Sequence, residues 1–216
     1  VDIANRIELK QIRAGIVVSA ESSRAIVDAT VAQLNATPTI DAYRLGLATM
    51  TGGSGAVAVV LTEAGFSDSE HRLVAGAALA APEHHRLCKW GPTQGLLGET
   101  PNVMTTDASH VLEHGVALGK RTWQRFLDEA GWRGDDVDRV ICHQVGASHR
   151  REVLGTLGID QQRDFSTFET LGNMGTVSVP LTAAMADEAG FLRSGDRVGF
   201  LGIGSGLNCL MLGLHW

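Results

Sequence analysis

The closing segment of the chain, residues 197–216, constrains the fold more than any other stretch. Its sequence, RVGFLGIGSGLNCLMLGLHW, has two apolar runs on either side of a Gly-rich bend. Apolar runs with so few charges are typical of strands that are buried on both faces. The bend GIGSG superficially resembles a dinucleotide-binding loop, but a strand follows it where such a loop needs a helix. We therefore expect a hairpin whose glycines let backbone N–H groups approach a ligand.

A weaker copy of this pattern occurs near the start of the chain. Residues 8–20 resemble residues 189–202, and TGGSGAVAVVL resembles GIGSGLNCLML. Such self-similarity predicts a duplicated unit of helix, strand, GSG bend and strand. The first copy lacks its front part, and the apolar residues from Val1 to a stop near Gly15 follow helical spacing without a capping residue before them. The sequence therefore predicts a fragment of a longer protein that begins inside a helix.

Strand and helix patterns alternate along the rest of the chain. Apolar runs predict strands over 14–21, after the first GSG bend, over 136–144 and 164–170, and on both sides of GIGSG. Helical spacing predicts helices over 22–37, 107–132, 148–159 and 179–190, with Asp107 as an N-cap and Gly131 and Gly158 near helix ends. Residues 71–82 suit a strand or a short helix, 38–48 a loop, and 83–106 a long loop over one face. This order indicates an α/β fold with helical layers on a mostly buried sheet.

Composition and charge argue against several classes of protein. With 216 residues, 44 % of them hydrophobic, the chain can bury a sizeable core. A net charge of -6 and a pI near 5.7 argue against a general nucleic-acid binder, which needs a basic surface. No uncharged apolar run is long enough to span a membrane, and there is no secretory signal. Three scattered cysteines without metal-type spacing fit a reducing compartment, so we expect a cytoplasmic protein.

Two polar residues stand directly after predicted strands. His143 follows the apolar run VIC, and Asn173 lies in the Gly-bracketed turn of TLGNMGTVSVP, residues 170–180. Polar side chains at the ends of neighbouring strands are the usual way in which an α/β fold builds a site. A His N–H and an Asn amide can hold a developing oxyanion, an effect of roughly 3 kcal/mol per donor. For either residue alone a structural role stays open: a strand-end histidine bonded to the backbone, or an asparagine in a left-handed turn.

The sequence HVLEH matches the H-x-x-E-H pattern of some zinc peptidases. His110, Glu113 and His114 would lie on one helix face. No third ligand follows at a characteristic spacing, so a solvated helix face is favoured over a zinc site.

Cys142 and His143 are consecutive residues of a predicted strand, so their side chains should point to opposite faces of the sheet. We therefore predict that Cys142 is a small buried side chain and not a nucleophile.

Taken together, ICHQ, LGNMGTVSVP and the closing GIGSGL resemble motifs of the thiolase-fold condensing enzymes. The similarity runs in order along the whole chain. The nearest branch is the β-ketoacyl synthase III family and, within it, the OleA-type enzymes, which join two long fatty acyl thioesters head to head. The resemblance implies a layered α-β-α-β-α fold with two βαβαβαββ halves. In this chain, residues 1–65 would be the remainder of the first half, 66–106 a connecting cover segment and 107–216 the C-terminal half.

The resemblance also implies roles for particular residues. His143 matches the family histidine, Asn173 the family asparagine, and Gly206 the glycine whose backbone N–H faces the thioester oxyanion. The catalytic cysteine of the family has no match among the three cysteines here, so the nucleophile is expected upstream of Val1 and the chain alone is expected to be inactive. Gly146 stands where synthase III enzymes have an asparagine, which favours the OleA-type branch. No catalytic base is assigned, because the base of that branch comes from an N-terminal region of the partner subunit.

The implied function is that of an acyltransferase that condenses fatty acyl thioesters, from acyl-CoA or acyl carrier protein, to a β-keto product by Claisen chemistry. No metal or redox cofactor is implied, and a homo- or heterodimer is expected. Pantetheine contacts are expected within residues 90–98 or beside Gly146, and the apolar segments 71–81 and 96–97 are expected to line an acyl channel. One alternative is a non-catalytic subunit that completes a heterodimeric condensing enzyme. The H-x-x-E-H zinc peptidase is a remote alternative.

Overall fold

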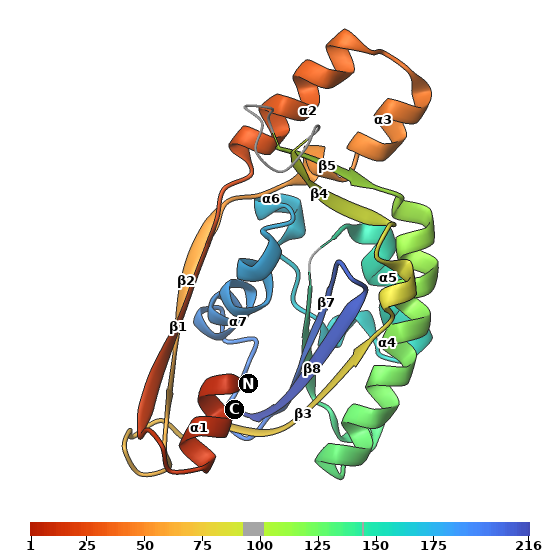
Figure 1. Ribbon diagram of the computed structural model, residues 1–216. Helices are drawn as coiled ribbons and strands as arrows, with labels where there is room; N and C mark the ends of the chain where they lie inside the picture. The colour runs from red at the N-terminus through yellow and green to blue at the C-terminus, as the bar shows by residue number, and fades with distance from the viewer. Residues whose placement is uncertain (93–101, 144) are drawn as a thin grey trace.

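The computed structural model of the protein describes residues 1–92, 102–143 and 145–216. At its centre lies a four-stranded sheet in the order β3-β8-β7-β6 (Figure 1). β6 and β7 are parallel, whereas β8 is antiparallel to both β7 and β3. The strands are β3 (Arg72–Ala80), β6 (Arg139–Cys142), β7 (Arg197–Gly204) and β8 (Asn208–His215).

Helices cover both faces of this sheet. On one face α4 (Ala108–Ala130) crosses β3 and β8, and α5 (Ala147–Leu157) packs beside α4. On the other face α7 (Ser178–Glu188) lies against β6 and β7. Beyond α7 follows a ribbon of two antiparallel strands, β1 (Ala14–Glu21) and β2 (Gly55–Thr62). Figure 1 shows the resulting layers: the helix pair, the sheet, α7 and the ribbon.

The other elements are short and mostly lie at the ends of these layers. The helices are α1 (Asp2–Glu8), α2 (Arg24–Ala36), α3 (Ile40–Gly46) and α6 (Phe168–Leu171). A separate hairpin consists of β4 (Cys88–Pro92) and β5 (Asn102–Thr106). The 3-10 turns are η1 (Thr49–Thr51), η2 (Pro82–His84), η3 (Gly134–Asp136), η4 (Gln161–Arg163) and η5 (Gly175–Val177).

The sheet separates two hydrophobic cores. Val140 and Ile141, neighbours on β6, are both fully buried but belong to different cores, because successive side chains of a strand point to opposite faces. The larger core lies under α4 and contains Leu118 and Phe126. The predicted mostly buried sheet with helices on its faces is thus confirmed.

The predicted ends of α4 and α5 are also confirmed. The side chain of Asp107 accepts a hydrogen bond from the His110 N–H at 3.3 Å and caps α4. Gly131 ends α4 and Gly158 ends α5, both in the left-handed conformation, which glycine adopts without steric penalty. Pro180 lies in the first turn of α7, a position that tolerates proline.

The predicted hairpin around GIGSG is confirmed as well. β7 and β8 pair along their whole length, and the turn takes only residues 205–207. The shorter β6 pairs only with residues 198–201 of β7. β7 therefore continues for residues 202–204 past the end of β6, and the hairpin tip extends beyond His143, the residue after β6.

Two segments predicted as loops contain regular structure. Residues 38–48 include α3, whose first turn is capped by the hydroxyl of Thr39, which accepts from the Ala42 N–H at 3.2 Å. Pro38 precedes this helix and Gly46 is its last residue. Residues 83–106 contain the β4–β5 hairpin, and residues 93–101 lie outside the described residues. Residues 71–82, which suited either a strand or a short helix by sequence, contain the strand β3.

The predicted strand over residues 164–170 is wrong. Only Asp164 pairs with the sheet, through an isolated bridge to Val140. The segment then turns into α6. Phe165 and Phe168 are three residues apart, a spacing that suits a helical turn better than the alternation of a strand. Asn173 consequently follows a short helix and not a strand.

The strand over residues 14–21 forms as predicted, but it is not buried on both faces. In the ribbon, Ile16 and Val18 of β1 and Val60 of β2 are 58 %, 69 % and 66 % exposed. On the opposite face Ser19 and Gly55 contact η5 and α7, but Val17 and Val59 are still 46 % and 37 % exposed. Among the described residues this face of the ribbon therefore packs only in part.

The opening helix ends earlier than predicted. α1 stops at Glu8, and Lys10 adopts a positive φ of 57° directly after it. Gly15 has a different role from the predicted helix stop. A Cβ there would lie 2.7 Å from the side chain of Ile3, so glycine lets α1 pack closely on β1.

In the described parts of the chain, every helix is too short or too polar to cross a membrane.

The core under α4 yields a first prediction. Phe126 is 0 % exposed and packs against the rings of Trp123 and Trp132, at centroid distances of 5.3 and 5.9 Å. Phe126→Ala should lower the free energy of unfolding by about 3–5 kcal/mol, because it leaves a cavity. The matched control is Arg125→Ala on the exposed side of the same helix, where an ion pair with Glu129 at 3.0 Å contributes at most about 0.5 kcal/mol. If urea denaturation shows that the two variants lose equal amounts of unfolding free energy, this assignment of the core is contradicted.

Candidate active site

His143 is held at the end of β6 by main-chain bonding. Its backbone N–H donates to the carbonyl of Leu201 on β7 at 2.8 Å. The half-buried side chain lines a cavity of about 30 Å³ between α4, α5 and the β7–β8 hairpin, whose other lining residues include Val153, Ile203 and Met211. A cavity of this volume has room for one or two water molecules. His143 therefore faces a small, mostly apolar recess.

The recess keeps the imidazole uncharged. Burial, with repulsion from His149 as the second cause, lowers the pKa of His143 from 6.5 to about 4. Burial also lowers the pKa of His149, which lies on α5 and lines the same cavity. A neutral imidazole has one N–H donor and one acceptor nitrogen. Near pH 7, His143 can therefore donate a hydrogen bond without carrying a positive charge.

The end of β6 is braced by a buried carboxylate that the sequence did not point to. Asp164 is 5 % exposed, accepts from the Cys142 backbone N–H at 3.1 Å and pairs with Arg150 at 2.5 Å. Burial raises the pKa of the Asp164 carboxyl, and Arg150 and the Cys142 N–H partly offset the rise. Arg150 also donates to the backbone carbonyl of Gln161 at 2.9 Å. This network fixes the backbone immediately before His143.

Asn173 is clamped on both sides of its backbone. Its N–H donates to the carbonyl of Thr51 at 2.9 Å, and its carbonyl accepts from the N–H of Gly53 at 2.7 Å. The side-chain Oδ1 accepts from the N–H of Gly175 at 3.0 Å, which closes an Asx-type turn. Within the described residues no hydrogen bond uses Nδ2 of Asn173. The amide is thus oriented by its oxygen, and its N–H groups are available to a ligand.

The left-handed turn considered for Asn173 belongs to its neighbour. Gly172 has a φ of 67°, and a Cβ on Gly172 would collide with the carbonyl oxygen of Thr51. The glycine before Asn173 therefore takes both the unusual conformation and the close approach of the two backbones. Asn173 itself does not have a positive φ, so a left-handed conformation does not account for an asparagine here, whereas the Asx-type turn closed by its Oδ1 uses this side chain.

Gly206 lies in the turn of the β7–β8 hairpin. Its φ is 140°, and a side chain would collide with the amide of Asn208. The next residue, Leu207, exchanges two backbone hydrogen bonds with Ala81, at 3.1 and 2.8 Å. The tip is thereby attached to the segment that follows β3. None of the hydrogen bonds among the described residues engages the Gly206 N–H, so this donor is available.

The three predicted residues lie on neighbouring elements but do not bond to one another. His143 and the β7–β8 hairpin are linked through the main chain of β7. α6, which precedes Asn173, contributes Phe168 to a second small recess that also includes His143 and Gly146. In the described part of the chain, no hydrogen bond joins His143, Asn173 and Gly206. The described residues that line the two recesses beside His143 include neither Asn173 nor Gly206, so the convergence of the three residues on one substrate stays a prediction.

The buried cysteines are unsuitable as nucleophiles. Burial raises the pKa of the Cys142 thiol well above its usual range and also raises that of Cys209, and a nucleophilic cysteine must be a thiolate. Cys142 is buried, as predicted, and it lines the same cavity as His143. Cys88 is half-buried and accepts a hydrogen bond from the Ser205 hydroxyl at 3.1 Å.

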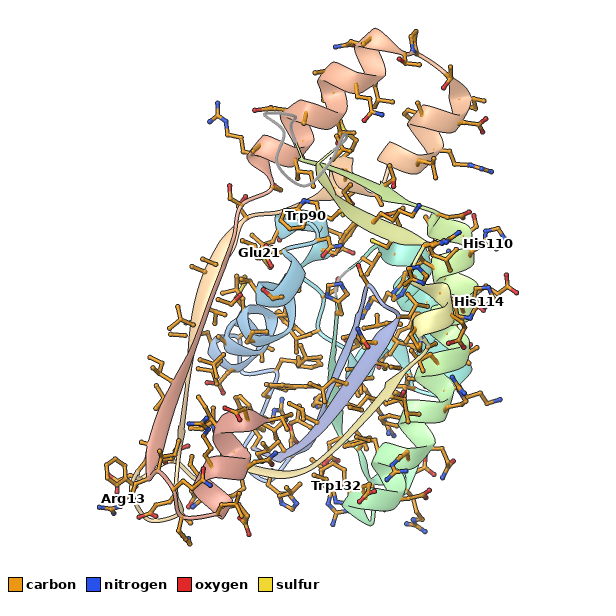
Figure 2. All side chains as sticks on the ribbon, viewed as in Figure 1. Arg13, Glu21, Trp90, His110, His114 and Trp132 are labelled. Atoms are coloured by element: carbon orange, nitrogen blue, oxygen red, sulfur yellow. The ribbon has the colours of Figure 1, made fainter. Side chains whose placement is uncertain are left out.

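The HVLEH residues have other partners than a metal. His110 and His114 share one side of α4 (Figure 2), with ring centroids 6.4 Å apart. Nδ1 of His110 lies 2.8 Å from Oδ2 of Asp107, and His114 stacks on His84 at a centroid distance of 3.8 Å. Among the residues that the structure describes, no group of three or more His, Cys, Asp or Glu side chains is arranged to hold a metal ion.

The expected pantetheine and acyl-chain segments are only partly described. Trp90 lies on β4 and is 69 % exposed. Residues 93–98, which include the expected channel residues 96–97, lie outside the described residues. The cavity beside His143 is lined from α4, α5, β7 and β8 and not from segment 71–81, where Ala77 instead packs into the core under α4. Both assignments stay predictions.

The lowered pKa of His143 predicts how stability changes with pH. The imidazole has a pKa of 6.5 when unperturbed and about 4 in the folded protein, so between these values the unfolded chain binds a proton that the folded chain does not. The free energy of unfolding should fall as the pH falls through this window, by roughly 2 kcal/mol at pH 4.5, since one pKa unit corresponds to about 1.4 kcal/mol.

Urea denaturation at pH 7.0 and pH 4.5 checks this dependence. His143→Gln should lose less stability on acidification than the wild type, and His85→Gln, at an exposed histidine, should behave like the wild type. An equal loss in all three proteins would show that His143 is not held neutral.

The Asp164 network gives a separate prediction. Asp164→Ala leaves the partly buried Arg150 without a counter-charge and the Cys142 N–H without an acceptor. We expect the free energy of unfolding to fall by about 3–5 kcal/mol. Asp135→Ala, at an exposed aspartate in η3, should change it by less than about 0.5 kcal/mol. Similar values for the two variants in urea denaturation would show that the network does not brace β6.

Comparisons with known proteins agree with this architecture. Residues 127–216 match the family model described as 3-oxoacyl-[acyl-carrier-protein (ACP)] synthase III C terminal. Over its full length the chain is 54 % identical to an acyl-CoA:acyl-CoA alkyltransferase of Shewanella oneidensis and 32 % identical to a protein of the same name from Xanthomonas campestris. The chain spans 62 % of the length of each of these relatives.

Solved structures of Xanthomonas campestris OleA superpose on the whole chain. A variant with bound lauric acid and lauroyl-CoA gives a TM-score of 0.88 at 32 % identity, with 62 % of that chain covered. The cerulenin-bound protein gives a TM-score of 0.90 at 31 % identity, with 60 % covered. These values confirm the thiolase-like fold expected from the sequence motifs. Over its full length the chain is therefore similar in sequence and in fold to the condensing enzymes of the synthase III and OleA group.

Proposed function

We propose that the complete natural protein joins two fatty acyl thioesters in a Claisen condensation that yields a β-keto product. The observation that carries this proposal is the neutral, half-buried imidazole of His143, together with an Asn173 amide whose oxygen is fixed and whose N–H groups are available. The names of the relatives, acyl-CoA:acyl-CoA alkyltransferase, and the lauroyl-CoA bound to one of them make long-chain acyl-CoA the first substrate to test.

His143 and Asn173 are proposed to hold the carbonyl oxygen of the thioester that becomes the nucleophile. Loss of a proton or of CO₂ from its α-carbon leaves a carbanion, and negative charge then develops on this oxygen. Two neutral donors bind the oxygen more strongly as its charge grows, so they stabilise the transition state more than the ground state. A protonated histidine is not needed, which agrees with the low pKa of His143.

Gly206 is proposed to serve the other thioester. The carbanion carbon bonds to the acyl carbon of this second group, whose C–S bond then breaks, and the thiolate leaves with the electron pair. Before that bond breaks, the acyl oxygen carries negative charge, and a backbone N–H aimed at it stabilises this intermediate. The available N–H at the hairpin tip supports this role. No nucleophilic cysteine is assigned within the chain, because none of its three cysteines matches the catalytic cysteine of the family, and burial raises the thiol pKa of Cys142 and Cys209.

The test uses the complete natural protein with lauroyl-CoA as substrate. We expect release of free CoA together with a β-keto product, measured by a thiol reagent and by mass spectrometry. His143→Ala and Asn173→Ala should each reduce kcat by roughly 100- to 1,000-fold, the effect of removing one oxyanion donor. His85→Ala and Asn35→Ala, at exposed positions, are the matched controls and should retain the wild-type rate.

Several outcomes would contradict the proposal. CoA release that yields only free fatty acid would indicate hydrolysis instead of condensation. Full condensation by His143→Ala would exclude the proposed role of this residue. A wild-type protein without any acyl transfer, which nevertheless restores activity to a second condensing subunit, would favour the alternative of a non-catalytic partner.

A further inference from the structure

Glu21, the last residue of β1, reaches the turn that carries Asn173. Its Oε1 accepts two hydrogen bonds from Thr176, one from the backbone N–H at 3.2 Å and one from the hydroxyl at 2.7 Å. The same oxygen would lie 2.9 Å from a Cβ built on Gly175, so the carboxylate rests directly against this glycine. Figure 2 shows Glu21 at the end of the ribbon that is nearest to α6.

The hydroxyl hydrogen bonds in this contact have a defined direction. The Thr176 hydroxyl has a single hydrogen, and a carboxylate can only accept, so this hydrogen goes to Glu21. The hydroxyl oxygens of Ser19 and Thr176 are 2.5 Å apart, and Ser19 must therefore be the donor in that pair. A short relay runs from Ser19 through Thr176 to Glu21 and joins β1 to the turn.

The contact also satisfies an open helix end. η5 leads directly into α7, whose first residues have no side-chain cap and no acidic residue of their own. The first N–H groups of a helix lack partners within the helix and carry partial positive charge. Glu21 supplies an acceptor and a negative charge there, from a strand that lies 155 residues earlier in the sequence.

The position of Asn173 depends on this end of the helix. The N–H of Gly175 holds Oδ1 of Asn173 at 3.0 Å, and Gly175 lies between Asn173 and Thr176. The clamp to Thr51 and Gly53 holds only the backbone of Asn173. The orientation of the amide therefore rests on where Gly175 is placed, and Glu21 contacts Gly175 and bonds the residue after it.

We propose that Glu21 is a positioning residue that orients the Asn173 amide toward the substrate carbonyl, an inference that rests on the function proposed above. Without the carboxylate, the Asn173 backbone stays clamped while its side chain loses its fixed direction. Small misplacement of a reacting or stabilising group costs on the order of 100-fold in rate. Because Glu21 contacts no substrate in this scheme, its loss should act on kcat and not on KM.

The test compares variants of the complete natural protein. Glu21→Ala should lower kcat for lauroyl-CoA condensation roughly 10- to 100-fold with KM within about threefold. Glu21→Gln keeps an acceptor oxygen and should restore most of the rate. Glu63→Ala is the matched control, because Glu63 follows the other ribbon strand and pairs with Arg13 at 2.6 Å, at the far end of the ribbon in Figure 2.

Hydrogen exchange supplies a readout that does not depend on activity. In Glu21→Ala the Thr176 amide should exchange faster, whereas the Asn173 amide, which is bonded to Thr51, should not change. A protein that does not condense acyl thioesters would refute the proposed function, and this measurement would still test the contact. Should Glu21→Ala fail to fold, Thr176→Val removes the same hydroxyl bond and should lower kcat in the same direction.

The inference is overturned if Glu21→Ala and Glu63→Ala have equal kcat values, or if Glu21→Ala raises KM as much as it lowers kcat. It is also overturned if Glu21→Gln is as impaired as Glu21→Ala. The double variant Glu21→Ala, Thr176→Val should be no slower than Glu21→Ala alone, because both changes remove one interaction. Additive losses would show that the two residues act separately.

Discussion

The difference in length between β6 and β7 decides where a site can form. β6 pairs only with residues 198–201 of β7, so β7 projects three residues past its parallel neighbour, roughly 10 Å at about 3.3 Å per residue. The projecting residues 202–204 lack a strand partner on the β6 side, and the recess beside His143 lies there. A longer β6 would fill this space with ladder hydrogen bonds and separate His143 from the hairpin tip.

The same geometry sets the electrostatics. A residue at the end of a buried strand has apolar neighbours from both covering layers, and burial disfavours the charged form of its imidazole. An unpaired carboxylate at the end of β6 would act in the opposite direction and favour the imidazolium. Arg150 neutralises Asp164 at 2.5 Å, so the carboxylate can brace the backbone of β6 without attracting a proton to His143. The ion pair thus braces the backbone before His143, while burial keeps the imidazole uncharged.

Local patterns predicted most elements but only part of the site. Asp107 and Gly158 could be assigned because helix ends depend on residues within one turn. Asn173 was predicted as a site residue on the assumption that a strand precedes it, and the structure places α6 there. Glu21 and Asp164 could not be identified, since their partners lie 155 and 22 residues away. Tertiary contacts of this kind leave no periodicity in the sequence.

The duplicated pattern explains why these contacts run between distant segments. Each copy forms an antiparallel pair, β1 with β2 and β7 with β8, and each has a GSG bend before its second strand. In one copy the bend is the hairpin tip with Gly206. In the other it begins at Gly53, which bonds the Asn173 carbonyl and leaves no room for a Cβ beside the Leu171 carbonyl. One bend thus carries the backbone N–H proposed as an oxyanion donor, and the other holds the backbone of the proposed side-chain donor Asn173. The two glycines are needed for different reasons. Gly53 lets the Leu171 backbone approach closely, whereas Gly206 has a φ of 140° and lies against the side-chain amide of Asn208.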